Sequence, residues 1–336
     1  MGSLPPTLIS RAARLAPPLL SIGLAACSVP AQAEALSVKP ARVGWVSLYP
    51  DPQVKTLLDA FRYGLAERGF VEGKNLEIIT RSGNGSRERM PAMIEELVFL
   101  KPDVIVTHAA ATFSARQVTT RPVVFGFSGD PIIAELTDSL ARPSRNLTGV
   151  SFMQVELNEK RLDLLHQIAP EAKTIVLMGD PVHPGADLEV QASEKIASQL
   201  GIAVRWQPTR NSAAVQDLLA ELDRTPPDAL VILPDAVMLE NRERVSEFAI
   251  RHRIPAVSGW AVFAHGGGLF TYGPRLSDSF RRLAYFVTRI VEGASPSELP
   301  IEQPTMFELV VNLRTARAIR LKIPPTLLAR ADEVIE

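Results

Sequence analysis

The chain has 336 residues, of which 46% are hydrophobic and 22% are charged, and its formal net charge is -1. This is the balance of a globular protein with one large domain or two compact ones. The near-zero net charge argues against nucleic acid as a partner, because the sequence lacks the basic excess that binding a phosphate backbone requires. No stretch contains the roughly 18 or more uninterrupted apolar residues of a membrane helix.

The first forty residues have the layout of a secretory signal peptide. Arg11 and Arg14 precede an apolar stretch at 15–26, and small residues follow it. A short positive segment, an apolar segment and small residues at the cleavage point are the features that the export machinery reads. We therefore expect the mature protein to be exported to the periplasm.

Two processing routes remain open. Ala31-Gln32-Ala33 is a site of the A-x-A type, and cleavage there removes a signal peptide at 1–33. Leu24-Ala25-Ala26-Cys27 resembles a bacterial lipobox, and its use would remove 1–26 and leave a lipidated Cys27 that anchors the protein to a membrane. Cys27 is the only cysteine of the chain, so a disulfide within it is excluded.

From residue 42 onward, short apolar runs alternate with segments of helical periodicity. This alternation predicts an α/β protein with parallel sheets that helices cover on both faces. The predicted strands lie at 42–48, 75–80, 103–107, 122–127, 146–152, 173–178, 202–206, 229–233, 256–257 and 269–272.

The last sixty residues are too few for a third domain. They contain a helical pattern around 280–290, a strand at 307–312 and a short helix at 315–321. We expect these segments to complete the two earlier sheets, so the chain should cross between them near 150–155, 273–277 and 303–307.

The predicted fold is therefore two Rossmann-like lobes joined by three hinge crossovers. One lobe comprises 42–152 plus 277–303, and the other comprises 153–273 plus 307–325. Two lobes on several connecting strands make a hinge with a cleft between them, which suits the capture of a small molecule.

Ligands of open α/β sheets bind beyond the carboxyl ends of the strands. The loops expected there are rich in Gly, Pro, Asp, Ser and Thr, which turn formation alone could also explain. The stretch DVIVTHAAATFSAR at 103–116 runs from a buried strand through small residues into a helical pattern. Small residues there would let a ligand carboxylate approach the free N–H groups of a helix start.

The candidate ligand contacts come from these strand ends. The hydroxyls are expected to donate to the ligand, the carboxylates to receive an ammonium group, and the aromatic rings to enclose an apolar part. The candidates are Tyr49, His108, Ala110, Ala111, Thr112, Ser128, Asp130, Asp180, Asp235, Trp260 and Tyr272.

Catalytic chemistry finds little support in the sequence. The five histidines show no metal-ligand spacing, and neither a G-x-S-x-G elbow nor a phosphate loop is present. His108 could act as a general base, but no nucleophile stands beside it in sequence. We expect no enzymatic activity, no metal and no cofactor.

Four longer segments carry a family resemblance: AFRYGLAERGFVEGKNLEI at 60–78, GDPIIAELTDSLARPSRNLTGVSF at 129–152, EKRLDLLHQIAPEAKTIVLM at 159–178, and the closing stretch 271–336. With them the chain resembles the periplasmic substrate-binding proteins of ABC transporters, in the TrpX-like branch that includes tryptophan- and tyrosine-binding proteins. The resemblance implies a type I periplasmic-binding fold and a non-enzymatic role. The chain departs from the family pattern at two predicted contacts. THAAATFSA replaces a Gly-Thr-Pro-Ala-like turn, and Asp180-Pro181 replaces an Asn-Pro turn.

The expected function is that of the exported solute-binding component of an ABC importer. It would capture a small amphoteric metabolite, such as an aromatic or branched amino acid, and deliver it to a permease in the inner membrane. The alternatives are a periplasmic ligand sensor that signals to a membrane receptor, and a two-lobed enzyme with His108 and Asp130 in its cleft.

Overall fold

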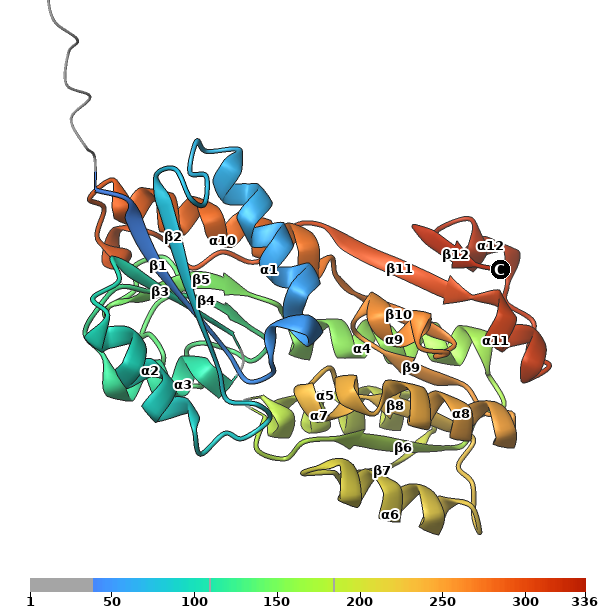
Figure 1. Cartoon of the computed structure of the whole chain (residues 1–336). Helices are drawn as coiled ribbons and strands as arrows, with labels where there is room; N and C mark the ends of the chain where they lie inside the picture. Colours follow the sequence, from blue (N-terminus) through green and yellow to red (C-terminus); the bar gives the residue numbers. More distant parts are fainter. Residues whose placement is uncertain (1–38, 109, 184) are drawn as a thin grey trace, which may run out of the picture. The chain divides into compact units, whose positions relative to one another are not determined.

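The computed structural model describes residues 39–108, 110–183 and 185–336, and Figure 1 labels its elements. Residues 39–336 form one compact unit. The predicted signal peptide and Cys27 lie outside the described residues. No helix in the described part of the chain has both the length and the apolar character to cross a membrane.

The first sheet is parallel throughout and has the strand order β2-β1-β3-β4-β5. Two apolar clusters cover its two faces, one with α1 and α10 and the other with α2 and α3. Its elements are β1 (Ala41–Ser47), α1 (Asp51–Ala66), β2 (Leu76–Ser82), α2 (Met90–Phe99), β3 (Val104–His108), α3 (Ala110–Val118), β4 (Val123–Phe127), β5 (Leu147–Ser151) and α10 (Leu276–Val291).

The second sheet has the order β12-β11-β10-β9-β8-β6-β7 and is parallel except for the pair of β10 with β11. Its strands are β6 (Thr174–Gly179), β7 (Ala203–Pro208), β8 (Ala229–Ile232), β9 (Ala256–Ser258), β10 (Phe270–Pro274), β11 (Phe307–Asn312) and β12 (Glu333–Ile335). Its helices are α4 (Gln154–Ile168), α5 (Ala186–Gln199), α6 (Ser212–Leu222), α7 (Ala236–Glu240), α8 (Arg242–His252), α9 (Ala261–His265), α11 (Leu313–Ala318) and α12 (Pro325–Leu328).

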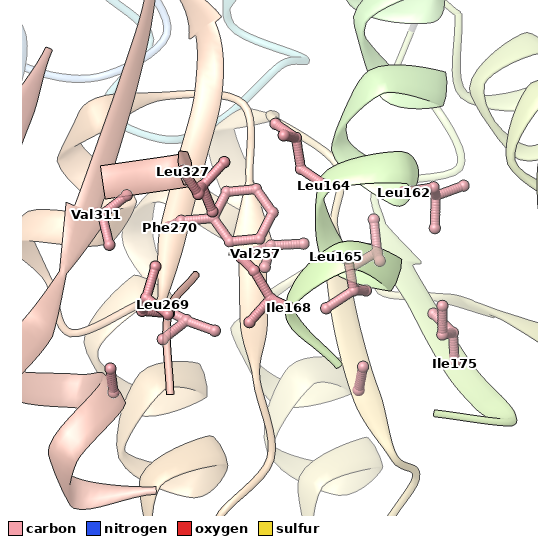
Figure 2. Close-up of a cluster of buried hydrophobic side chains, with 14 of the residues drawn as sticks. Leu162, Leu164, Leu165, Ile168, Ile175, Val257, Leu269, Phe270, Val311 and Leu327 are labelled. Carbon is pink, nitrogen blue, oxygen red and sulfur yellow. The ribbon is translucent and has the colours of Figure 1, made fainter. Parts of the chain in front are cut away.

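One core cluster of the second lobe lies between α4 and the sheet. Figure 2 shows Leu165 and Ile168 of α4 near Val257 and Phe270 of neighbouring strands. These side chains are almost completely buried. The strands read as continuous apolar runs because helices cover both of their faces.

The chain passes between the two sheets three times, as the sequence predicted. It leaves the first sheet after β5, returns after β10 to form α10, and crosses again through 303–306 to β11. Before the last crossing, Glu302 pairs with Val150 of β5. The detailed lobe limits, 42–152 plus 277–303 and 153–273 plus 307–325, stay a prediction, because both sheets belong to one compact unit.

A fully buried arginine ties two of these crossings together. Arg161 of α4 donates from Nε to the Tyr272 carbonyl of β10 at 2.8 Å, from Nη1 to Asn158 Oδ1 at 3.4 Å, and from Nη2 to Gln154 Oε1. Burial lowers the pKa of Arg161 to about 10, so it remains charged at neutral pH. The first half of α4 is thereby held against the middle of β10.

Two expectations about the C-terminal part were wrong in detail. The helix predicted at 315–321 begins at Leu313 and ends at Ala318, because the Asn312 side chain caps it by accepting from the Thr315 N–H at 3.0 Å. β11 runs antiparallel to β10, whereas the alternating pattern predicted parallel strands. A direct return from α10 through 303–306 brings the chain in from the opposite end of the sheet.

Candidate functional site

A cavity of about 420 Å³ lies beyond the carboxyl ends of strands from both sheets. This volume lies within the range of about 300–1,000 Å³ that is usual for small-molecule sites. The lining residues are Leu48, Tyr49, Val54, Leu57, Arg87, His108, Ala110, Phe113, Ser114, Gly126, Ser128, Phe152, Val182, His183, Asp235, Ala236, Leu239, Trp260, Leu276 and Phe280.

One wall of the cavity is built from aromatic rings. Trp45 of β1 and Phe280 of α10 both lie beside the His108 ring at the end of β3, with centroid distances of 5.7 and 5.8 Å. The Phe152 ring follows at 6.1 Å from Phe280. Gly126 makes room for this arrangement, because a Cβ atom there would lie 2.9 Å from the Phe152 ring. Of these rings, His108, Phe152 and Phe280 line the cavity, and Trp45 is buried behind them. We call Trp45, His108, Phe152 and Phe280 the aromatic wall.

The imidazole in the aromatic wall is neutral and has no polar partner among the residues that the structure describes. Burial lowers the pKa of His108 to about 4. Its Nε2 atom is enclosed without a hydrogen-bond partner, as is Nε1 of Trp45 behind it. Among the described residues none forms a hydrogen bond with either ring nitrogen of His108.

Two aspartates lie close together where β6 and β8 end. Asp235 accepts from the Asp180 N–H at 2.7 Å and from the Met238 N–H at 2.9 Å, so it also caps α7. Burial raises the pKa of Asp235 to about 7, because the loss of hydration outweighs the two N–H donors. A carboxyl with this pKa is partly ionised at neutral pH.

Two polar contacts join the lobes beside the cavity. Arg87, in the loop between β2 and α2, forms an ion pair with the buried Asp180, which follows β6. Ser128 Oγ, at the end of β4, lies 2.6 Å from His183 Nε2. Both contacts end on residues 180–183, which we call the 180–183 turn. The cavity is therefore closed on this side by direct contact between the lobes.

The second ring nitrogen of His183 lies near a buried carboxyl group. This Nδ1 atom lies 3.8 Å from Glu189 Oε1 in the first turn of α5, and neither atom has a hydrogen-bond partner in the described part of the chain. Burial, with a contribution from Arg87, lowers the pKa of His183 to about 4. Burial raises the pKa of Glu189 to about 8, against the attraction of Arg161. At neutral pH the imidazole is neutral and the carboxyl mostly protonated.

Six of the predicted contact residues line the cavity: Tyr49, His108, Ala110, Ser128, Asp235 and Trp260. They come from the ends of five different strands, as expected for ligand residues of α/β sheets. Burial raises the pKa of Tyr49 well above its usual range. The Trp260 Nε1–H is enclosed without a hydrogen-bond partner. Contact of these residues with a ligand stays a prediction.

The other five predicted residues do not line it. Ala111 and Thr112 are fully buried, because α3 turns them toward the sheet, where Thr112 Oγ1 lies 3.0 Å from Thr107 Oγ1. Asp130 accepts from the N–H groups of Ile132 and Ile133 and so shapes its own turn.

Asp180 and Tyr272 are also engaged elsewhere. The Asp180 carboxylate pairs with Arg87, so it borders the cavity only through that partner. The Tyr272 ring packs beside Phe307 at 6.3 Å, in the core of the second lobe.

Several lining residues were missed by the sequence analysis. Arg87 follows the second strand, and the strand-end rule would have found it had that loop been included. His183 lies three residues beyond Asp180, in a loop from which only Asp180 was chosen as a candidate contact. No sequence signal indicated Leu276 and Phe280. They belong to α10, which packs on the first sheet although more than 100 residues separate it from β5, the last strand of that sheet.

Among the described residues no group of three or more His, Cys, Asp and Glu side chains could hold a metal ion. The cavity offers instead apolar surface, the paired guanidinium of Arg87, the partly ionised carboxyl of Asp235 and a few uncharged polar groups. This combination fits a small organic molecule with a flat apolar part.

Comparison with known proteins agrees with this architecture. The family model described as ABC transporter substrate binding protein matches residues 46–335. A relative named tyrosine-binding protein, from Clostridioides difficile strain R20291, is 21% identical over 289 residues, which cover 85% of this chain and 83% of the relative.

Two solved structures share the fold over 88% of this chain and 100% of their own. One is a conserved domain protein from Vibrio cholerae O1 biovar El Tor, with a TM-score of 0.83 and 25% identity. The other is an ABC domain in complex with L-Trp from Streptococcus pneumoniae, with a TM-score of 0.82 and 21% identity.

Proposed function

Because the chain belongs to the family of ABC transporter substrate-binding proteins, we propose that it captures an aromatic amino acid in the cavity between its lobes and delivers it to a membrane permease. The observation that carries the proposal is the lining of the cavity. It combines an aromatic wall with polar groups from both lobes at strand ends.

The apolar part of the lining suits a flat ring. Val54 and Leu57 of α1, and Leu276 and Phe280 of α10, contribute apolar side chains from the first lobe, and Trp260 contributes an indole from the second. Rings of ligand and protein pack at offset or edge-on angles and gain more than burial alone provides. The relatives whose names mention tyrosine and L-Trp support the same class of ligand.

The polar part of the lining suits a zwitterion. The ligand carboxylate would lie at the N-terminus of α3, where Ala110 leaves the backbone open, and within reach of Arg87. The ammonium would lie near the Asp235 carboxyl and the Tyr49 ring, which can attract a cation through its face. Each group occupies a lining position.

Delivery requires that the lobes open and close. The contacts of Arg87 and Ser128 with the 180–183 turn link the lobes beside the cavity. A ligand favours the closed state only to the extent that it binds that state better. We propose that the closed form is the one a permease recognises, and that release accompanies the breaking of these two contacts.

We further propose that the protein acts outside the inner membrane. Family membership supports a periplasmic or extracellular location, and the first 33 residues have the pattern of an export signal. Cell fractionation of the wild type and Cys27→Ser separates the two processing routes. Release of the variant from membranes supports the lipid anchor, whereas a wild type that is free after export supports simple cleavage.

The site assignment can be tested with one substitution. Ala110→Asp puts a negative charge at the start of α3, where it would repel a ligand carboxylate. We expect aromatic amino acids to bind roughly 100-fold more weakly or worse, because opposed like charges cost several kcal/mol. Ala213→Asp is the control, since this exposed residue lies in the first turn of α6, outside the cavity. Equal affinity of both variants would remove the carboxylate assignment.

A further inference from the structure

The His108 imidazole is the polar group in an otherwise apolar wall. Its neighbours Phe152 and Phe280 are apolar, and Trp45, which has an indole N–H donor, is completely buried behind it and does not line the cavity. His108 itself is only partly buried and lines the cavity. A ligand ring that packs against the aromatic wall therefore meets one hydrogen-bonding group there.

This imidazole carries an unmet hydrogen-bonding capacity. Neither ring nitrogen has a partner among the described residues, and Nε2 is enclosed. Buried polar groups are nearly always hydrogen-bonded, and one left unsatisfied calls for a physical explanation. Two of the other histidines, His252 and His265, have carboxylate partners at 2.6 and 2.9 Å, and His183 has a hydroxyl partner.

The position and the chemistry of His108 both suit it to form a hydrogen bond with a polar substituent on the ligand ring. It ends β3, where it pairs with Gly126 of β4, and the rings of Trp45 and Phe280 fix its plane. A neutral imidazole has one N–H donor and one lone pair. A phenolic hydroxyl both donates and accepts, so it satisfies either tautomer. An indole N–H can only donate and satisfies one tautomer, and an unsubstituted phenyl ring satisfies neither.

We propose that His108 is the specificity-determining residue of the cavity, and that it selects a hydroxylated aromatic amino acid over its unsubstituted analogue. This inference rests on the proposed function and narrows its ligand class. A site built to hydrogen-bond a ligand hydroxyl discriminates strongly against the analogue that lacks it, because the protein group is then left unpaired.

The test is calorimetric titration of the purified protein with L-tyrosine and L-phenylalanine. We expect wild type to bind tyrosine roughly tenfold or more tightly than phenylalanine. His108→Phe keeps an aromatic ring in the wall but removes both nitrogens, so the ratio should fall to about one. His108→Gln restores a donor and an acceptor and should recover part of the preference, provided that its melting curve shows a folded protein.

A matched control is available in α4. His166 is also partly buried and has an enclosed ring nitrogen without a partner, but it does not line the cavity. His166→Phe should keep the wild-type ratio. Equal binding of the two amino acids by wild type, or an unchanged ratio in His108→Phe, overturns the inference while leaving the proposed function standing. Binding of no aromatic amino acid at all, tryptophan included, overturns both.

Discussion

Ser128 Oγ lies 2.6 Å from His183 Nε2, and this contact joins the end of β4 in the first sheet to the turn after β6 in the second. Three residues earlier in the same turn, Asp180 pairs with Arg87. Val182 lies between them, lines the cavity and is 61% exposed. A single short segment of the second lobe thus makes two polar contacts with the first, directly beside the candidate site.

The Ser128–His183 contact should contribute to ligand affinity. Ser128→Ala removes it and leaves the imidazole without a partner, so the closed state loses stability relative to the open one. One buried hydrogen bond is worth about 0.5–1.5 kcal/mol, which corresponds to a loss of roughly 2- to 10-fold in affinity for an aromatic amino acid. Calorimetric titration of wild type and Ser128→Ala with the amino acid measures this loss of affinity.

Thr148→Ala is the matched control for this prediction. The Thr148 hydroxyl is buried and donates to the Leu299 carbonyl at 2.7 Å, away from the 180–183 turn and outside the cavity lining. Its loss should lower the unfolding free energy but leave affinity unchanged. Equal affinity of Ser128→Ala and wild type would show that the contact has no part in closure.

The ion pair of Arg87 with Asp180 should behave as a coupled unit. Asp180 is 1% exposed, so Arg87→Met leaves a buried carboxylate without its cation and should cost about 1–3 kcal/mol of unfolding free energy. Adding Asp180→Asn removes that charge and should recover part of the loss. Urea unfolding of both single variants and the double variant gives the coupling energy, and strictly additive losses would contradict a direct interaction.

Glu189 should make stability depend on pH in the neutral range. Its pKa is raised by burial to about 8 in the folded protein, from an ordinary value of 4.5. Between these values the folded state holds a proton that the unfolded state has lost, so stability falls as pH rises. The slope approaches about 1.4 kcal/mol per pH unit. Glu189→Gln removes this dependence.

The measurement is urea unfolding at pH 5, 6.5 and 8, with the difference between variant and wild type taken at each pH. This difference cancels the effects of Asp235, whose pKa is also raised, and of His108 and His183, whose lowered pKa values destabilise the fold below pH 6.5. We expect the free energy of unfolding of Glu189→Gln to increase relative to that of wild type as pH rises. The exposed Glu247→Gln serves as control, and parallel profiles for Glu189→Gln and wild type would refute the assignment.

Much of the fold could be predicted because its strands are buried on both faces. The runs 103–107 and 173–178 contain three and four consecutive apolar residues, and the observed strands differ from these runs by about one residue at each end. The short elements α7, α9, α12 and β12 were not predicted. They span three to five residues each, so no periodicity could develop in them.

The candidate site was harder to predict than the fold. The strand-end rule located His108, Ser128 and Asp235, because each lies within two residues of the end of a recognisable apolar run. It could not tell that Thr112 faces the sheet, since the start of α3 decides which side chains point inward. Nor could it place Phe280, which packs beside His108 only through the return of α10 to the first lobe.

The central claim is that an aromatic amino acid occupies the cavity between the lobes. It is tested most directly by thermal unfolding of wild type and Ala110→Asp with rising concentrations of L-tyrosine, L-tryptophan and L-phenylalanine. We predict that at least one of the three stabilises wild type, by about 2.7 kcal/mol when it reaches 100 times its dissociation constant, and that the same concentration stabilises Ala110→Asp by far less. No stabilisation of wild type, or equal stabilisation of both proteins, would contradict the account.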